Sequence, residues 1–196
     1  MNELPLLPES TWTASRPDCP DPHLWHSTDD LATEDEVSRL VGAMVTALRP
    51  RVVVETGAHT GTTTRFIGQA LAEAGRGHVY AVEIKPEVAA SARERCAGLP
   101  VTVVEADSTD WEPRDAPIDV MWLDSEPWLR ASEIRRLAHW CTDRTVVGVH
   151  DTGPQHTTRG FLDVLADDGV IRPPLYLPTP RGVCWTMLNP GVGGLA

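Results

Sequence analysis

Apolar residues along the chain fall into short continuous runs that alternate with stretches of helical spacing. The runs predict strands at residues 51–55, 78–84, 101–106, 118–124 and 145–151. Helical spacing predicts helices at about 33–49, 60–74, 86–98, 128–141 and 158–167. The tail from 174 to 189 predicts two strands around a proline-glycine turn. Continuous apolar strands that alternate with amphipathic helices indicate an α/β fold, with a mostly parallel sheet covered on both faces.

The first 30 residues differ from the rest because they are rich in proline and polar residues, which predicts an irregular N-terminal arm. Trp12 and Trp25 lie in this arm, and rings of that size need cover from the core or from a site. The first helix follows, and the sequence TEDE at its start predicts a capping box between Thr33 and Glu36.

Composition bounds the classes of protein to which the chain can belong. With 196 residues, 41% of them hydrophobic and 23% charged, we expect one globular domain over 1–196, with a core from about 31 to 190. The net charge of −11 and the single lysine, Lys85, disfavour nucleic acid as a partner. No apolar run is long enough for a membrane span, and the N-terminus is not typical of a secretory signal. Four cysteines without a C-x-x-C pair predict reduced thiols and a cytoplasmic protein.

Acidic residues mark the end of every one of the five main predicted strands. Ligands of such sheets bind outside the carboxyl ends of the strands. Helix N-caps often use aspartate, which would account for one or two of these acids but less comfortably for all five. The sequence therefore predicts a site at this edge, with the acids Glu55, Glu83, Asp107, Asp124 and Asp151.

The loop after the first strand, in VVVETGAHTG, lacks both the lysine of a P-loop and the third glycine of a dinucleotide fingerprint. The carboxylate of Glu55 would repel a pyrophosphate and attract a cation. S-adenosylmethionine carries a sulfonium and an ammonium but no phosphate, so it fits this loop. We expect Gly57 and Gly61 to let the backbone approach its methionine portion.

The acids of the next two strands suit the rest of that cofactor. Glu83, at the end of the second strand, can accept both ribose hydroxyls. Asp107, after the third strand, can accept a hydrogen bond from the exocyclic amine of adenine.

The series ETGAHTG, VYAVEI, EADSTDW, IDVMWLD and VVGVHDTG resembles the motifs of class I S-adenosylmethionine-dependent methyltransferases, in particular small O-methyltransferases of the macrocin and catechol type. The resemblance implies a Rossmann-like three-layer sandwich, whose seven-stranded sheet has the order 3-2-1-4-5-7-6 with strand 7 antiparallel. It also implies that the cofactor is bound by the set Glu55, Gly57, Ala58, Gly61, Glu83, Asp107, Ser108 and Asp124.

The resemblance bears on metal binding as well. Metal-dependent members hold a divalent ion with an aspartate after strand 4 and an acidic pair after strand 5, positions that match Asp124, His150 and Asp151. A histidine replaces one acid, so either the ion differs from Mg²⁺, with Mn²⁺, Fe²⁺ or Zn²⁺ as candidates, or no metal is bound. The catalytic lysine of catechol-type enzymes is replaced by Pro127. His150 and His156 are then the candidate bases, and Asp124 completes the expected catalytic set.

The sequence thus predicts O-methylation of a small-molecule hydroxyl, and the subgroup suggests a homodimer. Two alternatives stay open. A nicotinamide-dependent oxidoreductase shares the acid of strand 2, and a catalytically silent binding protein could keep this fold without an acceptor site.

Overall fold

The computed structural model describes residues 13–14, 21–115 and 117–195. Most of the expected irregular arm, with Trp12 and Cys19, lies outside the described residues. Its described part contains a two-stranded antiparallel sheet, β1 (Thr13–Ala14) and β2 (His26–Ser27), and the short 3-10 helix η2 (Pro22–Leu24). Trp25 packs against the core beside α1 (Asp35–Leu48), so this ring is covered as expected.

The rest of the chain alternates between strands and helices in the predicted order. The elements are β3 (Val52–Thr56), α2 (Thr62–Ala74), β4 (His78–Glu83), α3 (Pro86–Arg95), β5 (Val101–Glu105), β6 (Ile118–Leu123), α4 (Arg130–Leu137), η3 (Ala138–Trp140), β7 (Cys141–His150), α5 (Thr158–Asp167), β8 (Leu175–Leu177) and β9 (Val183–Met187). Among the described residues, no helix is long and apolar enough to cross a membrane.

Seven strands form one sheet in the order β5-β4-β3-β6-β7-β9-β8. The pairs from β5 to β7 are parallel, and β9 is antiparallel to both of its neighbours. In strand numbers this is 3-2-1-4-5-7-6 with strand 7 antiparallel, so the predicted topology is confirmed. The carboxyl ends of the five parallel strands therefore meet at one edge.

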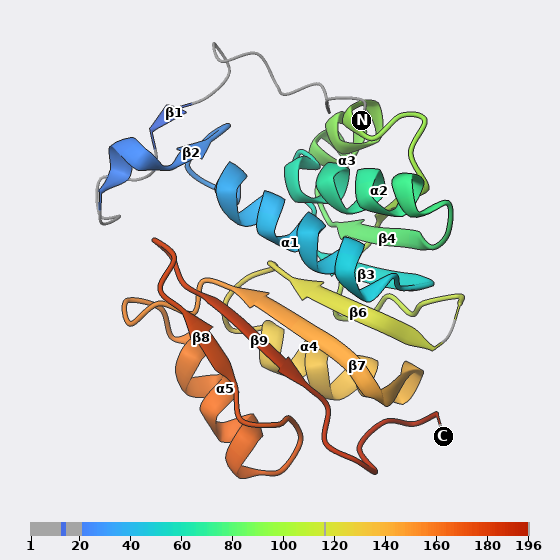
Figure 1. The fold of residues 1–196 in the computed structure, drawn as a ribbon, viewed down its shortest axis with the longest axis vertical. Helices are drawn as coiled ribbons and strands as arrows, with labels where there is room; N and C mark the ends of the chain where they lie inside the picture. Colours follow the sequence, from blue (N-terminus) through green and yellow to red (C-terminus); the bar gives the residue numbers. More distant parts are fainter. Residues whose placement is uncertain (1–12, 15–20, 116, 196) are drawn as a thin grey trace.

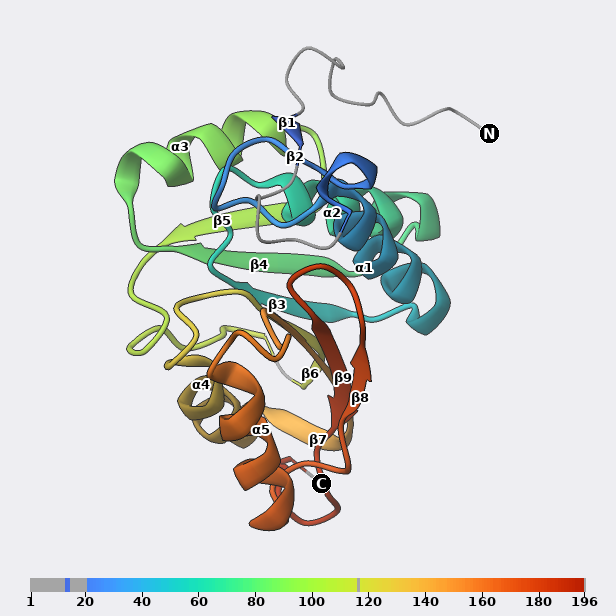
Figure 2. The ribbon, with the colours of Figure 1, turned by 90° about the vertical axis from the view of Figure 1, so that its left-hand side faces the viewer.

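Two hydrophobic layers bury the sheet, because successive side chains of a strand point to opposite faces. Val53 and Trp122 pack with α1 and α2, whereas Val54 and Leu123 pack with α4 and α5. Figures 1 and 2 show the sheet between these two pairs of helices, with α3 beside α2. The predicted three-layer sandwich is confirmed.

Candidate active site

A cavity of about 450 Å³ opens at the carboxyl ends of the parallel strands. It lies where the strand order reverses between β3 and β6, the position at which open α/β sheets bind ligands. All five acids predicted from the strand ends line it. Loops that follow β3 to β7 supply most of the wall, and residues 31–33 and the β8–β9 hairpin complete it.

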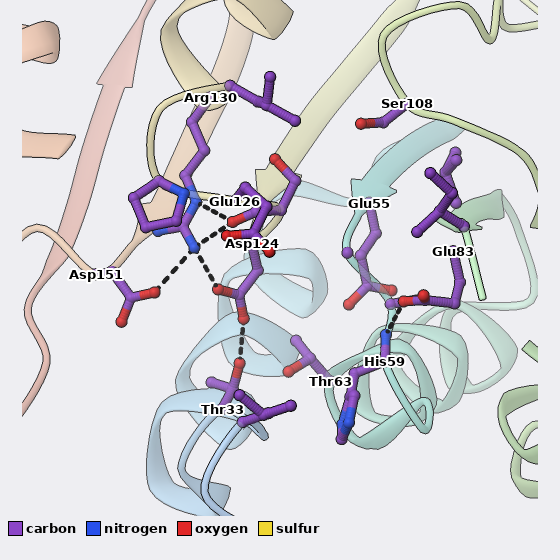
Figure 3. Close-up of a pocket in the computed structure, with 18 of the residues that line it drawn as sticks. Thr33, Glu55, His59, Thr63, Glu83, Ser108, Asp124, Glu126, Arg130 and Asp151 are labelled. Carbon is purple, nitrogen blue, oxygen red and sulfur yellow. Dashed lines mark hydrogen bonds and ion pairs between the residues drawn. The ribbon is translucent and has the colours of Figure 1, made fainter. Parts of the chain in front are cut away.

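Glu55 and Glu83 lie side by side in the cavity wall (Figure 3). Both side chains are buried. Glu83 accepts hydrogen bonds from the backbone amides of His59 at 2.9 Å and Lys85 at 3.0 Å. These bonds fix the loops after β3 and β4 relative to each other, so they set the shape of this end of the cavity.

Glu55 differs from Glu83 in that its Oε2 has no hydrogen-bond partner among the described residues, although the side chain is only 1% exposed. Burial, together with the charges of Asp124 and Glu83, outweighs the opposing effect of the nearby Thr64 hydroxyl and raises the pKa of Glu55 to about 8. A buried carboxylate oxygen without a partner is costly, and a cationic ligand in the cavity would supply that partner.

The loop after β3 contains two glycines, and contacts within the protein are the main reason that it needs them. Gly57 lines the cavity with φ of 73°, and a Cβ there would lie 2.3 Å from the carbonyl oxygen of Asp124. Ala58 also lines the cavity, and its amide donates to the carbonyl of Val82. Gly61 lies outside the lining, before α2, where a Cβ would contact Ala92 of α3 at 3.0 Å. Glycine is therefore required at 57 and 61 for loop geometry and close packing.

Asp107 and Ser108 line the cavity after β5. Asp107 is exposed, and its Oδ1 accepts from the amide and hydroxyl of Thr109 at 2.8 and 2.6 Å, which lowers the pKa of Asp107. The hydroxyl of Ser108 donates to Glu133, a buried residue of α4.

Glu133 was not singled out from the sequence, yet it organises the floor of the cavity. Its carboxylate accepts from the hydroxyls of Ser108, Thr56 (3.0 Å) and Ser125 (2.8 Å). One carboxylate from α4 thus joins the ends of three strands. In the sequence it is an ordinary helix acid, and its role follows only from burial.

The structure brings together Asp124, His150 and Asp151, as predicted. Each residue offers a carboxylate oxygen or ring nitrogen that could bind a metal, and these atoms lie within 4.8 Å of one another. The guanidinium of Arg130, a residue not predicted to belong to the site, lies between Asp124 and Asp151 (Figure 3). Its Nη2 donates to Asp124 Oδ1 at 3.1 Å and to Asp151 Oδ2 at 2.8 Å. Arg130 begins α4 and is 2% exposed, so this buried cation belongs to the site.

His150 is fully enclosed at the end of β7 and does not line the cavity. Its Nδ1 lies 3.1 Å from Asp124 Oδ1, and its Nε2 lies 3.1 Å from Glu34 Oε2. Burial favours neutral imidazole, but the charges of Asp124 and Asp151 and the bonds to Asp124 and Glu34 outweigh it and raise the pKa of His150 to about 9. His150 therefore carries a structural positive charge near neutral pH.

His156 is the candidate base that lines the cavity. Its Nε2 has no hydrogen-bond partner among the described residues and lies 3.7 Å from Asp151 Oδ1. Burial lowers the pKa of His156 despite the opposing charge of Asp151, so the neutral imidazole is available near pH 7. Of the two histidines, only this one faces the space that an acceptor would enter.

The N-terminal side of the wall is held by bonds that the predicted capping box does not contain. The Thr33 hydroxyl donates to Asp124, and Glu36 accepts from the backbone amide of His26. Helix α1 begins after Glu34 with no side-chain cap, so the predicted capping box is wrong. The physical reason is that the carboxylate of Asp124 competes for the Thr33 hydroxyl.

Arg181, in the β8–β9 hairpin, also lines the cavity and was not predicted. Its Nε and Nη2 donate to Asp151 at 2.7 and 3.1 Å, and its Nη1 donates to the carbonyl of Ala32. The antiparallel pairing of Val183 with His150 brings the hairpin to this position. The expected antiparallel last strand predicts that the hairpin lies near this edge of the sheet, but not that Arg181 meets Asp151.

Comparison with protein families places the chain by its sequence. Residues 54–152, just over half of the chain, match the model of a family described as a methyltransferase domain. The chain belongs to this methyltransferase family, and the predicted class is confirmed. The matched segment runs from Val54, within β3, to Thr152, so it contains all five acids. No curated protein matches the chain.

Solved structures, two of them described as O-methyltransferases, have the same fold. The chain is 19% identical to the O-methyltransferase TomG of Streptomyces achromogenes, with a TM-score of 0.69 and 82% of each chain covered. It is 15% identical to an O-methyltransferase of Bacillus cereus, with a TM-score of 0.71 and 82% and 84% of the two chains covered. Rv0187, from MTB, gives 17% identity, a TM-score of 0.72, and coverage of 83% and 84%. At such identities the likeness establishes the fold.

Proposed function

We propose that the protein is an S-adenosylmethionine-dependent methyltransferase that transfers a methyl group to an oxygen atom of a small molecule. The observation that carries the proposal is the buried Oε2 of Glu55, which has no hydrogen-bond partner in the part of the chain that the structure describes and lies in the wall of a cavity where the strand order reverses. The ammonium of the cofactor's methionine portion is a suitable partner for that oxygen. The TomG structure is a complex with S-adenosylmethionine, and the Bacillus cereus structure contains S-adenosylhomocysteine.

The remaining cofactor contacts are assigned to the same wall. Glu83 retains lone pairs for the ribose hydroxyls, since each oxygen accepts one backbone amide. Asp107 Oδ2 is left for the adenine amine, because Oδ1 is bonded to Thr109. Gly57, Ala58, Ser108 and Asp124 line the cavity nearby, whereas Gly61 supports the loop from outside the lining.

When bound, the cofactor would supply the methyl carbon of a sulfonium as the electrophile, and the neutral thioether of S-adenosylhomocysteine would be the leaving group as the C–S bond breaks. His156 takes the proton from the acceptor hydroxyl, because of the two candidate bases it is the one that lines the cavity, and burial lowers its pKa. Asp124, fixed by Thr33 and Arg130, holds the wall against which the acceptor is oriented. His150 supports this wall from behind rather than acting as the base.

The size of the cavity supports a small acceptor. About 450 Å³ lies within the usual range for a small-molecule site, and much of the lining is needed for the cofactor. The rim carries Leu31, Ile84 and Pro127, apolar side chains suited to a ring or alkyl portion of the acceptor. A homodimer stays a prediction of the family resemblance.

The experiment is transfer of a labelled methyl group from S-adenosylmethionine to a panel of phenols, sugars and other hydroxyl compounds, matched with the corresponding amines. We expect labelled ethers from at least one hydroxyl compound. Labelling of amines alone would contradict O-methylation. Cofactor binding without transfer to any acceptor would favour the silent binding protein.

A further inference from the structure

The three residues that the resemblance assigns to a divalent ion have no free lone pairs left to bind it. A divalent cation needs several oxygen or nitrogen lone pairs within about 2.0–2.6 Å and a site of net negative charge. Asp124, His150 and Asp151 are close enough together to be ligands. Their lone pairs and their charge are, however, already engaged.

The positions between the two aspartates are occupied by guanidinium nitrogens. Arg130 Nη2 bridges Asp124 Oδ1 and Asp151 Oδ2, the bridging place that a metal ion would take. Arg181 donates to both oxygens of Asp151 from the other side. The second oxygen of Asp124 accepts from Thr33, so all four carboxylate oxygens have donors.

Arg130 is held in place by more than the two aspartates. Its Nε donates to the carbonyl of Ser125 at 2.8 Å, and its Nη1 donates to the carbonyl of His150. Both ring nitrogens of His150 lie against carboxylates, which leaves no lone pair directed at an ion. A metal would have to expel a guanidinium that is 2% exposed and bonded on every side.

The charge balance points the same way. Asp124 and Asp151 carry two negative charges, and Arg130 and Arg181 carry two positive ones within hydrogen-bond distance of them. A divalent ion added to this centre would meet no net negative charge from the two pairs and would be repelled by the guanidinium groups. The residues present do not fit a metal.

We infer that Arg130 and Arg181 replace the divalent ion, so that the centre is closed to metals and Arg181 presents a fixed positive charge to the acceptor. Arg181 suits this role because it lines the cavity with 13% of its side chain exposed. Of its five N–H groups, three are engaged by Asp151 and Ala32, which leaves two for the acceptor oxygen. The role toward the acceptor rests on the proposed function, whereas the closure to metals does not.

The test is titration of the metal-free full chain with Mn²⁺, followed by electron paramagnetic resonance of the free ion and by calorimetry, with Zn²⁺ as a second ion. We expect no stoichiometric binding up to about 1 mM of either ion. One equivalent bound by the wild type and lost in Asp151→Asn, but kept in Glu126→Gln at the exposed rim, would overturn the inference. Asparagine tolerates the left-handed backbone of Asp151, whose φ is 51°, so this variant keeps the loop.

A pair of variants tests whether the guanidinium is what excludes the ion. Arg181→Met removes the charge and frees both oxygens of Asp151 on one side, so we expect Mn²⁺ affinity to increase at least tenfold. Arg181→Lys keeps the charge and should bind no better than wild type. Equal Mn²⁺ affinity in the methionine variant and the wild type would contradict the part of the inference that gives Arg181 a share in excluding the ion. Binding of S-adenosylhomocysteine, measured on the same samples, tests the proposed function separately and also reports that each variant is folded.

Discussion

Glu34 and His150, 116 residues apart in the sequence, are joined by a contact of 3.1 Å between Oε2 and Nε2. Both side chains are buried. The contact ties the residue before α1 to the end of β7, and the Thr33–Asp124 bond runs beside it. Together they hold residues 31–33 as a wall of the cavity, so the N-terminal side of the site depends on buried polar bonds.

Replacement of His150 tests this wall. We expect His150→Gln to lower the free energy of unfolding by about 3 kcal/mol at pH 6, because carboxylates of Glu34 and Asp124 lose a buried cation. Urea unfolding measures the change, and His23→Gln at an exposed position is the control. The pKa of His150 is raised to about 9, so its contribution is full below about pH 6.5 and lost as pH rises through 9. The deficit of the variant should therefore shrink between pH 6.5 and 10, and a pH-independent deficit would contradict this assignment.

Glu55 makes cofactor binding depend on protons. Its pKa of about 8 means that the carboxyl is mostly protonated in the free protein at pH 7. A cationic ligand favours the ionised form, so binding of S-adenosylhomocysteine should release about one proton at pH 7. Calorimetry in two buffers of different ionisation enthalpy measures this release.

Glu55→Gln is the matching variant. It should abolish the proton release and weaken binding by about 10- to 100-fold, through loss of a charged hydrogen bond. Glu126→Gln, at the exposed rim of the cavity, should change neither quantity. Unchanged affinity in Glu55→Gln would show that the cation lies elsewhere.

Substitution of Gly57 tests the close contact between the loops after β3 and β6. A Cβ at this position would lie 2.3 Å from the carbonyl oxygen of Asp124, and φ is positive. We expect Gly57→Ala to lower the free energy of unfolding by about 3 kcal/mol and to weaken cofactor binding. Gly160→Ala in α5 has open space around it, so it should raise stability by about 0.5 kcal/mol. Equal thermal stability of the two variants would be inconsistent with the described loop geometry.

His156 is the proposed base, so its removal should affect turnover more than binding. For an acceptor found in the panel, His156→Ala should lower kcat by about 10²- to 10⁴-fold, with unchanged affinity for S-adenosylhomocysteine. The lowered pKa of His156 places the acid limb of the wild-type pH profile below 6.5, and the variant should lack that limb. His139→Ala, at an exposed site, is the control. An acid limb retained in His156→Ala would assign the proton to another group.

Much of the fold and the cofactor side of the site could be predicted from the sequence, because both depend on local patterns. Strands end where their apolar runs end, and parallel strands bring those ends to one edge, so the sequence predicts Glu55 and Glu83 at the same edge of the sheet. The topology came from the family resemblance rather than from the pattern itself.

The acceptor side could not be predicted in the same way, because it depends on contacts between distant segments. In the sequence, Arg130 looks like any basic residue at the start of a helix. Arg181 likewise looks like any residue of a hairpin turn. Their pairing with Asp151 arises only when α4 and the β8–β9 hairpin pack against β7. The same holds for Thr33, whose hydroxyl bonds to Asp124, 91 residues away, rather than to its own helix.

Calorimetry of the full chain with S-adenosylhomocysteine and with NAD tests the central claim most directly. The arrangement of Glu55 and Glu83 predicts binding of one equivalent of S-adenosylhomocysteine, which NAD does not displace. Binding of NAD with no binding of S-adenosylhomocysteine would contradict the proposed cofactor and would favour an oxidoreductase.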